Sequence, residues 1–266
     1  MEQELVSVIM PTYNAGKFLA CSIESVLNQT YHYLELVITD DGSTDPLTLQ
    51  ILQKYEEDKR VRVFYSHENK GAGYARNNSI HEARGRYIAF CDSDDSWFPE
   101  KLEQQIAFMQ EKNCALSYTS YIICNKENEE TGIYIAPERV SFNMLKRDNK
   151  IGCLTAIYDI QALGTKFYMP LLRKRQDWAL FLTILKKCRI AYGITKPLAY
   201  YRNRNHSVSS NKFSLVKYNV KVYETILGFS KVKAYLYFFC FFIPTYYMKV
   251  IKKAIDSKKY IKNKLG

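Results

Sequence analysis

The chain has 266 residues, 47% of them hydrophobic and 24% charged, which is enough apolar material for a folded core and excludes a disordered chain. The net charge is +11, and residues 212–266 alone hold twelve lysines against two acidic residues, a net charge of +10. The seven scattered cysteines include no C-x-x-C pair, so we expect reduced thiols and no zinc site. The first ten residues begin with acidic side chains and hold no cationic segment, so we expect no signal peptide.

Strand and helix patterns alternate from the N-terminus to about residue 112. Short apolar, β-branched runs predict strands at 5–10, 34–39, 61–65 and 87–90. Apolar residues at helical spacing predict helices at 15–29, at 47–57, in a segment ending near 83, and after Pro99. This alternation predicts an α/β fold with a doubly wound, mostly parallel sheet and helices on both faces.

The second half of the chain alternates less regularly. We expect strands at 153–158 and 190–194 and a helix at 176–187, followed by a polar loop at 202–212. The remaining residues read as a basic, aromatic helical tail. The sequence therefore predicts a main domain at 1–211 and a tail at 212–266.

Three polar clusters each follow a predicted strand: PTYN at 11–14, DDGSTD at 40–45 and CDSDD at 91–95. Ligands of open α/β sheets bind in the crevice beyond the carboxyl ends of the strands. We therefore expect the three clusters to line one crevice.

Asp92, Asp94 and Asp95 place three carboxylates within four residues. Like charges this close repel one another, and a divalent cation relieves the repulsion. Oxygen ligands alone suit Mg²⁺ or Mn²⁺. The alternative is a solvated turn in which one aspartate caps the following helix.

Two further segments offer groups that could bind a nucleotide. Asp40 and Asp41 end a strand and can accept hydrogen bonds from a base or a ribose, although Asp, Gly and Ser also build plain turns. The segment NKGAGYAR at 69–76 resembles a dinucleotide fingerprint but lacks its third glycine, which argues against a Rossmann cofactor site. Arg76 in that segment is either a phosphate ligand or a surface arginine.

Asp177 stands at a predicted helix start, where an ionised carboxylate facing a cleft can act as a general base. The alternative is helix capping. His206 lies in the polar loop, either as a metal or phosphate ligand or as a solvated side chain.

Taken together, the motifs resemble the family 2 glycosyltransferases with the GT-A fold, of the bacterial cell-surface polysaccharide type. The matching segments are VSVIMPTYN at 6–14, ELVITDDGSTD at 35–45, NKGAGYARNNSI at 69–80, GRYIAFCDSDDSWFPEKL at 85–102 and, more weakly, RQDW at 175–178 with YYRNRNHSVS at 200–209. The resemblance covers roughly residues 5–210, and both the order and the spacing of the motifs agree.

The resemblance implies a division of roles in donor binding. The stretch Pro11, Thr12, Tyr13 and Asn14 would line the nucleotide, with the aromatic ring stacked on the base. Asp41 would bind the base, and Arg76 would lie near the donor phosphates or sugar.

The resemblance also implies a metal site and a catalytic base. Asp92, Ser93 and Asp94 match the D-x-D element that holds ribose and Mn²⁺ or Mg²⁺, Asp95 would share the metal, and His206 is a candidate ligand. Asp177 matches the catalytic base, although many relatives carry Glu where Gln176 stands here.

The activity so implied is an inverting, metal-dependent transfer of a sugar from a nucleotide-diphosphate donor, by default a UDP-sugar, to a lipid-linked saccharide acceptor. Residues 1–112 would form the nucleotide-binding half and 113–211 the acceptor-binding half of a catalytic domain. We expect a location in the cytoplasm or on the cytoplasmic face of the bacterial inner membrane, and no nucleic-acid partner. A sugar-phosphate nucleotidyltransferase and a non-catalytic nucleotide-sugar-binding protein are the alternatives, and the oligomeric state stays open.

The tail contains a stretch without any charge, residues 234–248, which is rich in aromatics and has lysines on both sides. It is shorter than the ~20 apolar residues that a spanning helix needs. We therefore expect residues 231–266 to lie on an anionic membrane surface. The alternative is a helix packed on the catalytic domain with a solvated lysine face.

Overall fold

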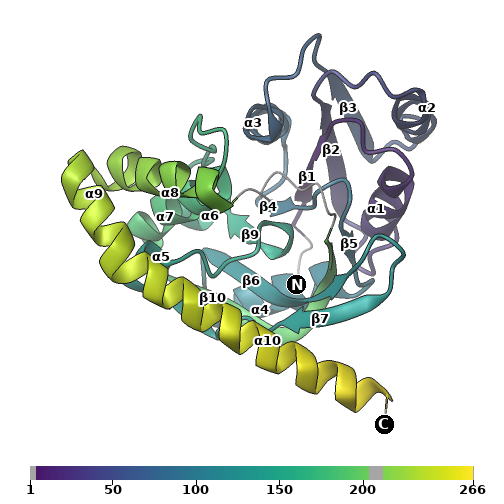
Figure 1. Ribbon diagram of the computed structural model, residues 1–266. Coiled ribbons are helices and arrows are strands. Elements are labelled where there is room, and N and C mark those ends of the chain that lie inside the picture. The colour runs from purple at the N-terminus through teal and green to yellow at the C-terminus, as the bar shows by residue number, and fades with distance from the viewer. Residues whose placement is uncertain (1–3, 204–211, 266) are drawn as a thin grey trace.

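The computed structural model describes residues 4–203 and 212–265 (Figure 1). Within these residues, ten strands form one sheet in the order β3-β2-β1-β4-β9-β6-β10-β5, with β7 paired to β6 and β8 paired to β10. The strands are β1 (Val6–Thr12), β2 (Leu34–Asp40), β3 (Val61–Tyr65), β4 (Tyr87–Phe90), β5 (Ser96–Trp97), β6 (Leu116–Cys124), β7 (Glu130–Tyr134), β8 (Arg139–Ser141), β9 (Ile157–Asp159) and β10 (Ile190–Arg202).

The sheet is parallel in its first half and mixed in its second. Strand β1 pairs in parallel with β2 and β4, and β2 pairs in parallel with β3. Strand β9 is antiparallel to β4 and to β6, whereas β6 and β10 are parallel. The doubly wound parallel arrangement predicted from the alternation therefore holds for β1 to β4.

Helices cover both faces of the sheet. One face packs against α1, α2 and α4, and the other against α3, α5, α7 and the start of the C-terminal segment. The helices are α1 (Phe18–Leu27), α2 (Pro46–Tyr55), α3 (Ala72–Glu82), α4 (Lys101–Lys112), α5 (Phe142–Arg147), α6 (Ile160–Leu163), α7 (Gln176–Cys188), α8 (Lys212–Leu227), α9 (Lys231–Tyr237) and α10 (Ile243–Leu265), with a 3-10 turn at Cys153–Thr155 and a π-helical turn at Phe238–Phe242.

Most predicted elements lie where the patterns placed them, and 61–65 and 87–90 match β3 and β4 at both ends. The prediction of one strand at 153–158 is wrong. Residues Cys153–Thr155 form a 3-10 turn in which the Gly152 carbonyl accepts hydrogen bonds from the Thr155 amide and hydroxyl, and β9 begins only at Ile157. The apolar composition of this segment suits both conformations, so the pattern could not separate them.

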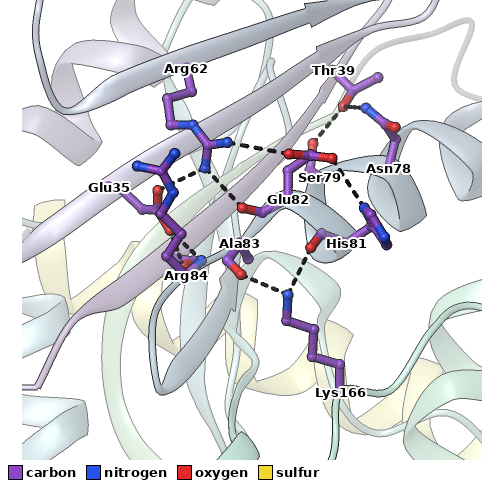
Figure 2. Close-up of polar contacts among 11 residues, drawn as sticks. Glu35, Thr39, Arg62, Asn78, Ser79, His81, Glu82, Ala83, Arg84 and Lys166 are labelled. Carbon is purple, nitrogen blue, oxygen red and sulfur yellow. Dashed lines mark hydrogen bonds and ion pairs between the residues drawn. The ribbon is translucent and has the colours of Figure 1, made fainter.

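Helix α3, which carries Arg76, is held to the sheet by a polar network (Figure 2). The hydroxyls of Ser79 and Thr39 are hydrogen-bonded at 2.7 Å, joining α3 to β2. At the C-terminal end of the helix, Arg62 on β3 donates to the Glu82 carbonyl at 2.8 Å. Lys166 donates to the Ala83 carbonyl at 2.6 Å, which covers the chain just beyond the helix. These contacts set the direction in which α3 presents its first turn.

The C-terminal helices run along the outside of the molecule as one long rod, the yellow element at the lower edge of Figure 1. Its first part shares the main core, because Phe238 and Phe242 are buried there. Its second part lies on β7, where Ser257 Oγ accepts the Ile133 amide at 3.0 Å. Gly132 permits this approach, since a Cβ at that position would overlap the Ser257 side chain. The tail is thus anchored to the domain along one of its faces.

Candidate active site

The chain segments that follow β1 and β2 meet at the carboxyl edge of the sheet. Thr12 and Asp40 are register partners at the ends of these strands. Asn14, whose φ of 46° lies in the left-handed region that Asn tolerates, accepts the amides of Thr44 and Asp45 with its side-chain oxygen, both at 2.9 Å. The two predicted clusters 11–14 and 40–45 are therefore brought together.

The members of the first cluster differ in exposure. Pro11 and Thr12 are buried, and the Thr12 hydroxyl has no hydrogen-bond partner within the described residues. Tyr13 keeps 49% of its surface exposed at the edge of the sheet. An exposed ring is available for stacking on a base, whereas the two buried residues shape the backbone beneath it.

Asp40 and Asp41 are both buried, and both bind backbone amides. Asp40 accepts the Ser43 amide at 2.9 Å and so closes the turn after β2. Asp41 accepts the amides of Lys70 and Gly71 at 2.9 and 2.7 Å, which joins this turn to the segment that opens α3. A carboxylate has about four acceptor positions, so two amide donors leave Asp41 able to accept from a further group.

Arg76 is buried and pairs with Asp92, Nη2 to Oδ1, at 2.5 Å. Burial is the largest single influence and disfavours its charge, but Asp92, Cys153 and Asp177 together outweigh burial and raise the pKa of Arg76. Its Nε is buried without a hydrogen-bond partner in the described residues. The charged guanidinium of Arg76, whose Nε has no partner among the described residues, therefore lies beside the D-x-D segment.

The three carboxylates of the 92–95 cluster do not behave alike. The Asp92 side chain is 29% exposed, and Asp94 is also partly exposed. Asp95 is buried, and its Oδ1 accepts the Arg202 amide at 2.9 Å. Burial raises the pKa of Asp95 well above its ordinary value, and the charges of Asp94 and Asp92 add to that rise.

These environments decide which residues fit a divalent cation. Among residues 4–203 and 212–265, no group of three His, Cys, Asp or Glu side chains converges on one point. Mg²⁺ in nucleotide sites needs only one or two carboxylates, because the substrate phosphates supply other ligands. Asp92 and Asp94 fit that arrangement, whereas the carboxylate of Asp95 is turned to the backbone of β10. The residue His206 lies outside the described part of the chain.

Asp177 lies in the first turn of α7, close to the start of α3. Gly73 makes this approach possible, because a Cβ at position 73 would come within 3.0 Å of the Gln176 side chain. The residue that precedes α7, Arg175, has a φ of 68°, a conformation that costs a side-chain-bearing residue of the order of 1–2 kcal/mol. Asn149 Nδ2 donates to Asp177 Oδ2 at 3.0 Å and orients the carboxylate.

Two residues of this arrangement were not predicted. Arg202 is buried at the end of β10, and its Nε donates to the Asp94 carbonyl at 2.9 Å, so it supports the D-x-D segment from 108 residues away. The motif YYRNRNHSVS contains Arg202, which was the available signal, but its spacing to 92–95 gave no hint of contact. Asn149 stands in no motif and is revealed by the fold alone.

Comparisons with known proteins give a family model and several named relatives. The family model described as Glycosyl transferase family 2 matches residues 7–168. The chain is 44% identical over 232 residues, 86% of this chain and 91% of the relative, to TuaG of Bacillus subtilis, which is named as a glycosyltransferase of teichuronic acid biosynthesis. It is 40% identical, over 82% of this chain and 84% of the relative, to WfgD of Escherichia coli, named as a UDP-Glc:alpha-D-GlcNAc-diphosphoundecaprenol beta-1,3-glucosyltransferase.

Solved structures confirm the predicted GT-A fold. The S. aureus TarS 1-349 structure in complex with UDP-GlcNAc superposes with a TM-score of 0.67 at 22% identity, covering 89% of this chain and 73% of that one. The mannosyltransferase PcManGT of Pyrobaculum calidifontis, in complex with GDP-Man and Mn²⁺, gives a TM-score of 0.60 at 16% identity, covering 96% and 76%. At these identities the likeness concerns the fold.

Proposed function

Because the chain belongs to glycosyl transferase family 2, in the branch that builds cell-surface polysaccharides, we propose that it transfers a sugar from a UDP-sugar to a hydroxyl of a lipid-linked saccharide. In this proposal the transfer inverts the configuration at the anomeric carbon of the sugar. The observation that carries this proposal is the Arg76–Asp92 ion pair between α3 and the end of β4, together with the close approach of Gly73 on α3 to Gln176, which precedes Asp177 on α7. Two relatives are named as UDP-glucose enzymes, so UDP-glucose is the first donor to test.

The donor side of the proposal uses the residues at the ends of β1 and β2. Tyr13 stacks on the base, and Asp41 accepts from it with the positions that the two amides leave free. Pro11, Thr12 and Asn14 shape the backbone around the nucleotide. Arg76 neutralises charge that builds on the departing diphosphate, for which its preset, buried guanidinium is well suited.

A divalent cation, Mn²⁺ or Mg²⁺, completes the donor site in this proposal. Asp92 and Asp94, with Ser93 between them, are the residues that would hold it. When bound, the ion supplies further positive charge to the leaving group. Asp95 is not a ligand of the cation in this proposal. Its carboxylate accepts the amide of Arg202 and so holds the 92–95 loop in place.

The acceptor side of the proposal depends on Asp177. Its carboxylate removes the proton of the acceptor hydroxyl as that oxygen attacks the anomeric carbon from the face opposite the diphosphate. Asn149 keeps the carboxylate oriented during this step. A single displacement inverts the anomeric configuration, and general-base assistance contributes about 10²–10⁴-fold to the rate.

A donor panel tests the function. The protein is incubated with UDP-, GDP- and dTDP-sugars in Mn²⁺ or Mg²⁺, with and without EDTA, and with a lipid-diphosphate-linked GlcNAc acceptor. We expect nucleoside diphosphate release from one UDP-sugar, lost in EDTA and accelerated by acceptor. If no nucleotide sugar binds and none is consumed, the assignment as an active transferase is wrong.

The variant Asp177→Asn tests the base. We expect it to bind donor as the wild type does and to lose about 10²–10⁴-fold in transfer rate. Its control is Glu103→Gln, which removes a carboxylate from the first turn of α4 away from the site. Near-wild-type turnover of Asp177→Asn would remove Asp177 from the mechanism.

A further inference from the structure

A cavity of about 230 Å³ lies between α10 and the β7 side of the domain. Four lysines line it: Lys150, Lys249, Lys252 and Lys253, together with the single carboxylate of Asp256. Its other walls include apolar side chains such as Met144 and Met248. The volume is below the roughly 300–1,000 Å³ of sites that enclose a drug-sized ligand, so it suits an ionic headgroup more than a whole molecule.

The positive charge of this cavity is only partly balanced. Asp148 pairs with Lys249 at 2.8 Å and, more distantly, with Lys150 at 3.9 Å. Within the described residues, neither Lys252 nor Lys253 has a carboxylate within 4.0 Å. Burial lowers the pKa of Lys253, and it lowers that of Lys249 despite the partner Asp148. An anion in the cavity would relieve this cost.

The cavity is tied to the proposed catalytic base through two consecutive residues. Lys249 Nζ donates to the Asn149 carbonyl at 2.8 Å, and the Asn149 side chain donates to Asp177. Lys150, which lines the cavity, follows Asn149 directly, so their Cα atoms are about 3.8 Å apart. Asn149 and Lys150 thus join the lysine cavity to the carboxylate of Asp177 through neighbouring backbone positions.

The same helix presents an unpartnered apolar face. Exposed apolar side chains recur every three or four residues along α9, the π-helical turn and α10: Val232, Leu236, Phe239, Ile243, Tyr247, Ile251 and Ile255. By length and composition, Lys231–Lys264 is long enough to cross a membrane, but one of its faces packs on β7. An in-plane position, with this stripe in the lipid, suits a helix of this kind.

We propose that the lysine cavity between α10 and β7 binds the diphosphate of the lipid-linked acceptor, with the lipid chain leaving along the apolar stripe into the membrane. This inference rests on the proposed function and deepens it. The contact chain from Lys249 through Asn149 to Asp177 connects this anion site to the proposed acceptor side of the active site.

Vesicle binding and kinetics test the inference with the full chain. The probes are phosphatidylcholine vesicles doped with polyprenyl diphosphate, and phosphatidylglycerol vesicles of the same total charge, each with and without inorganic pyrophosphate. We expect tighter binding to the diphosphate vesicles and competition by pyrophosphate. The double variant Lys252→Gln/Lys253→Gln should abolish the preference and raise the acceptor KM about tenfold while leaving the donor KM unchanged.

The control Lys258→Gln/Lys259→Gln removes the same charge from the same helix outside the cavity. It should weaken binding to both kinds of vesicle equally and keep the preference. Equal effects of the two double variants, or no preference in the wild type, would overturn the inference even if sugar transfer is intact. Failure of the donor panel, in contrast, would overturn the proposed function, and the vesicle comparison does not depend on it.

Discussion

Replacing Lys101 with methionine should remove a rise in stability that the wild-type protein gains above pH 7. Lys101 is fully buried at the start of α4, where its Nζ donates to Gln105 Oε1 at 2.8 Å and lies 4.1 Å from the centre of the Trp97 ring. Burial lowers the pKa of this ammonium group from 10.5 to about 7, and the nearby Cys91 opposes that shift only weakly.

The size of the effect follows from this pKa. Between pH 7 and 10.5 the unfolded chain holds the lysine proton and the folded chain has lost it, so stability increases with pH across that window. Each pKa unit corresponds to about 1.4 kcal/mol, which gives about 2 kcal/mol of gain from pH 7 to pH 9 once partial titration at pH 7 is included.

Urea unfolding of wild type and Lys101→Met at pH 7 and pH 9 measures this gain. Subtracting the two pH differences cancels every other titrating group, as well as the pH-independent cost of leaving Gln105 without a partner. We expect the wild type to gain about 2 kcal/mol more than the variant between the two pH values. Equal pH dependence in both proteins would refute the assignment of a neutral, buried Lys101 at alkaline pH.

Two further perturbations address the supports of the site and the membrane face. Arg202→Met should lower the free energy of unfolding by about 2–3 kcal/mol, because it removes buried, charge-assisted contacts to the 92–95 loop. The affinity for the sugar donor should fall as well, and Arg202→Lys should recover part of the stability and part of the affinity. Unchanged donor affinity in Arg202→Met would contradict the role of Arg202 as a support of the 92–95 loop. The double variant Ile251→Ser/Ile255→Ser keeps every lysine and should weaken binding to anionic vesicles about 30-fold or more, because two apolar side chains that are 45% and 61% exposed no longer enter the lipid. Sedimentation with vesicles measures this binding. Unchanged binding would place the apolar stripe outside the membrane.

These substitutions are a better test of the membrane face than removal of residues 231–266. In the sequence alone, the charge-free stretch 234–248 and its flanking lysines look separable from the domain. In the structure, however, Phe238 and Phe242 are part of the main core, and the Ser257 hydroxyl is hydrogen-bonded to Ile133 on β7. Truncation would therefore unfold part of the domain, and any loss of vesicle binding would have no clear cause.

The sequence by itself determined the α/β alternation, the ends of β3 and β4, and the parallel order that brings the carboxyl ends of β1, β2 and β4 to one edge of the sheet. These inferences depend on local periodicity and on the rule that parallel strands place their carboxyl ends on the same side. Residues close together in the sequence determine both the periodicity and the strand order, so these features could be inferred without knowing any long-range contact.

Only the tertiary structure decided which carboxylates of the 92–95 cluster stay partly exposed and what orients Asp177. Asp95 is turned inward by the Arg202 amide, 107 residues away, and Asp177 is held by Asn149 from another element. The fold also decided that α10 buries one face on β7 and leaves the other to solvent, with a lysine cavity between. Burial and pairing depend on residues far apart in the sequence, and a local pattern contains no information about which of them will meet.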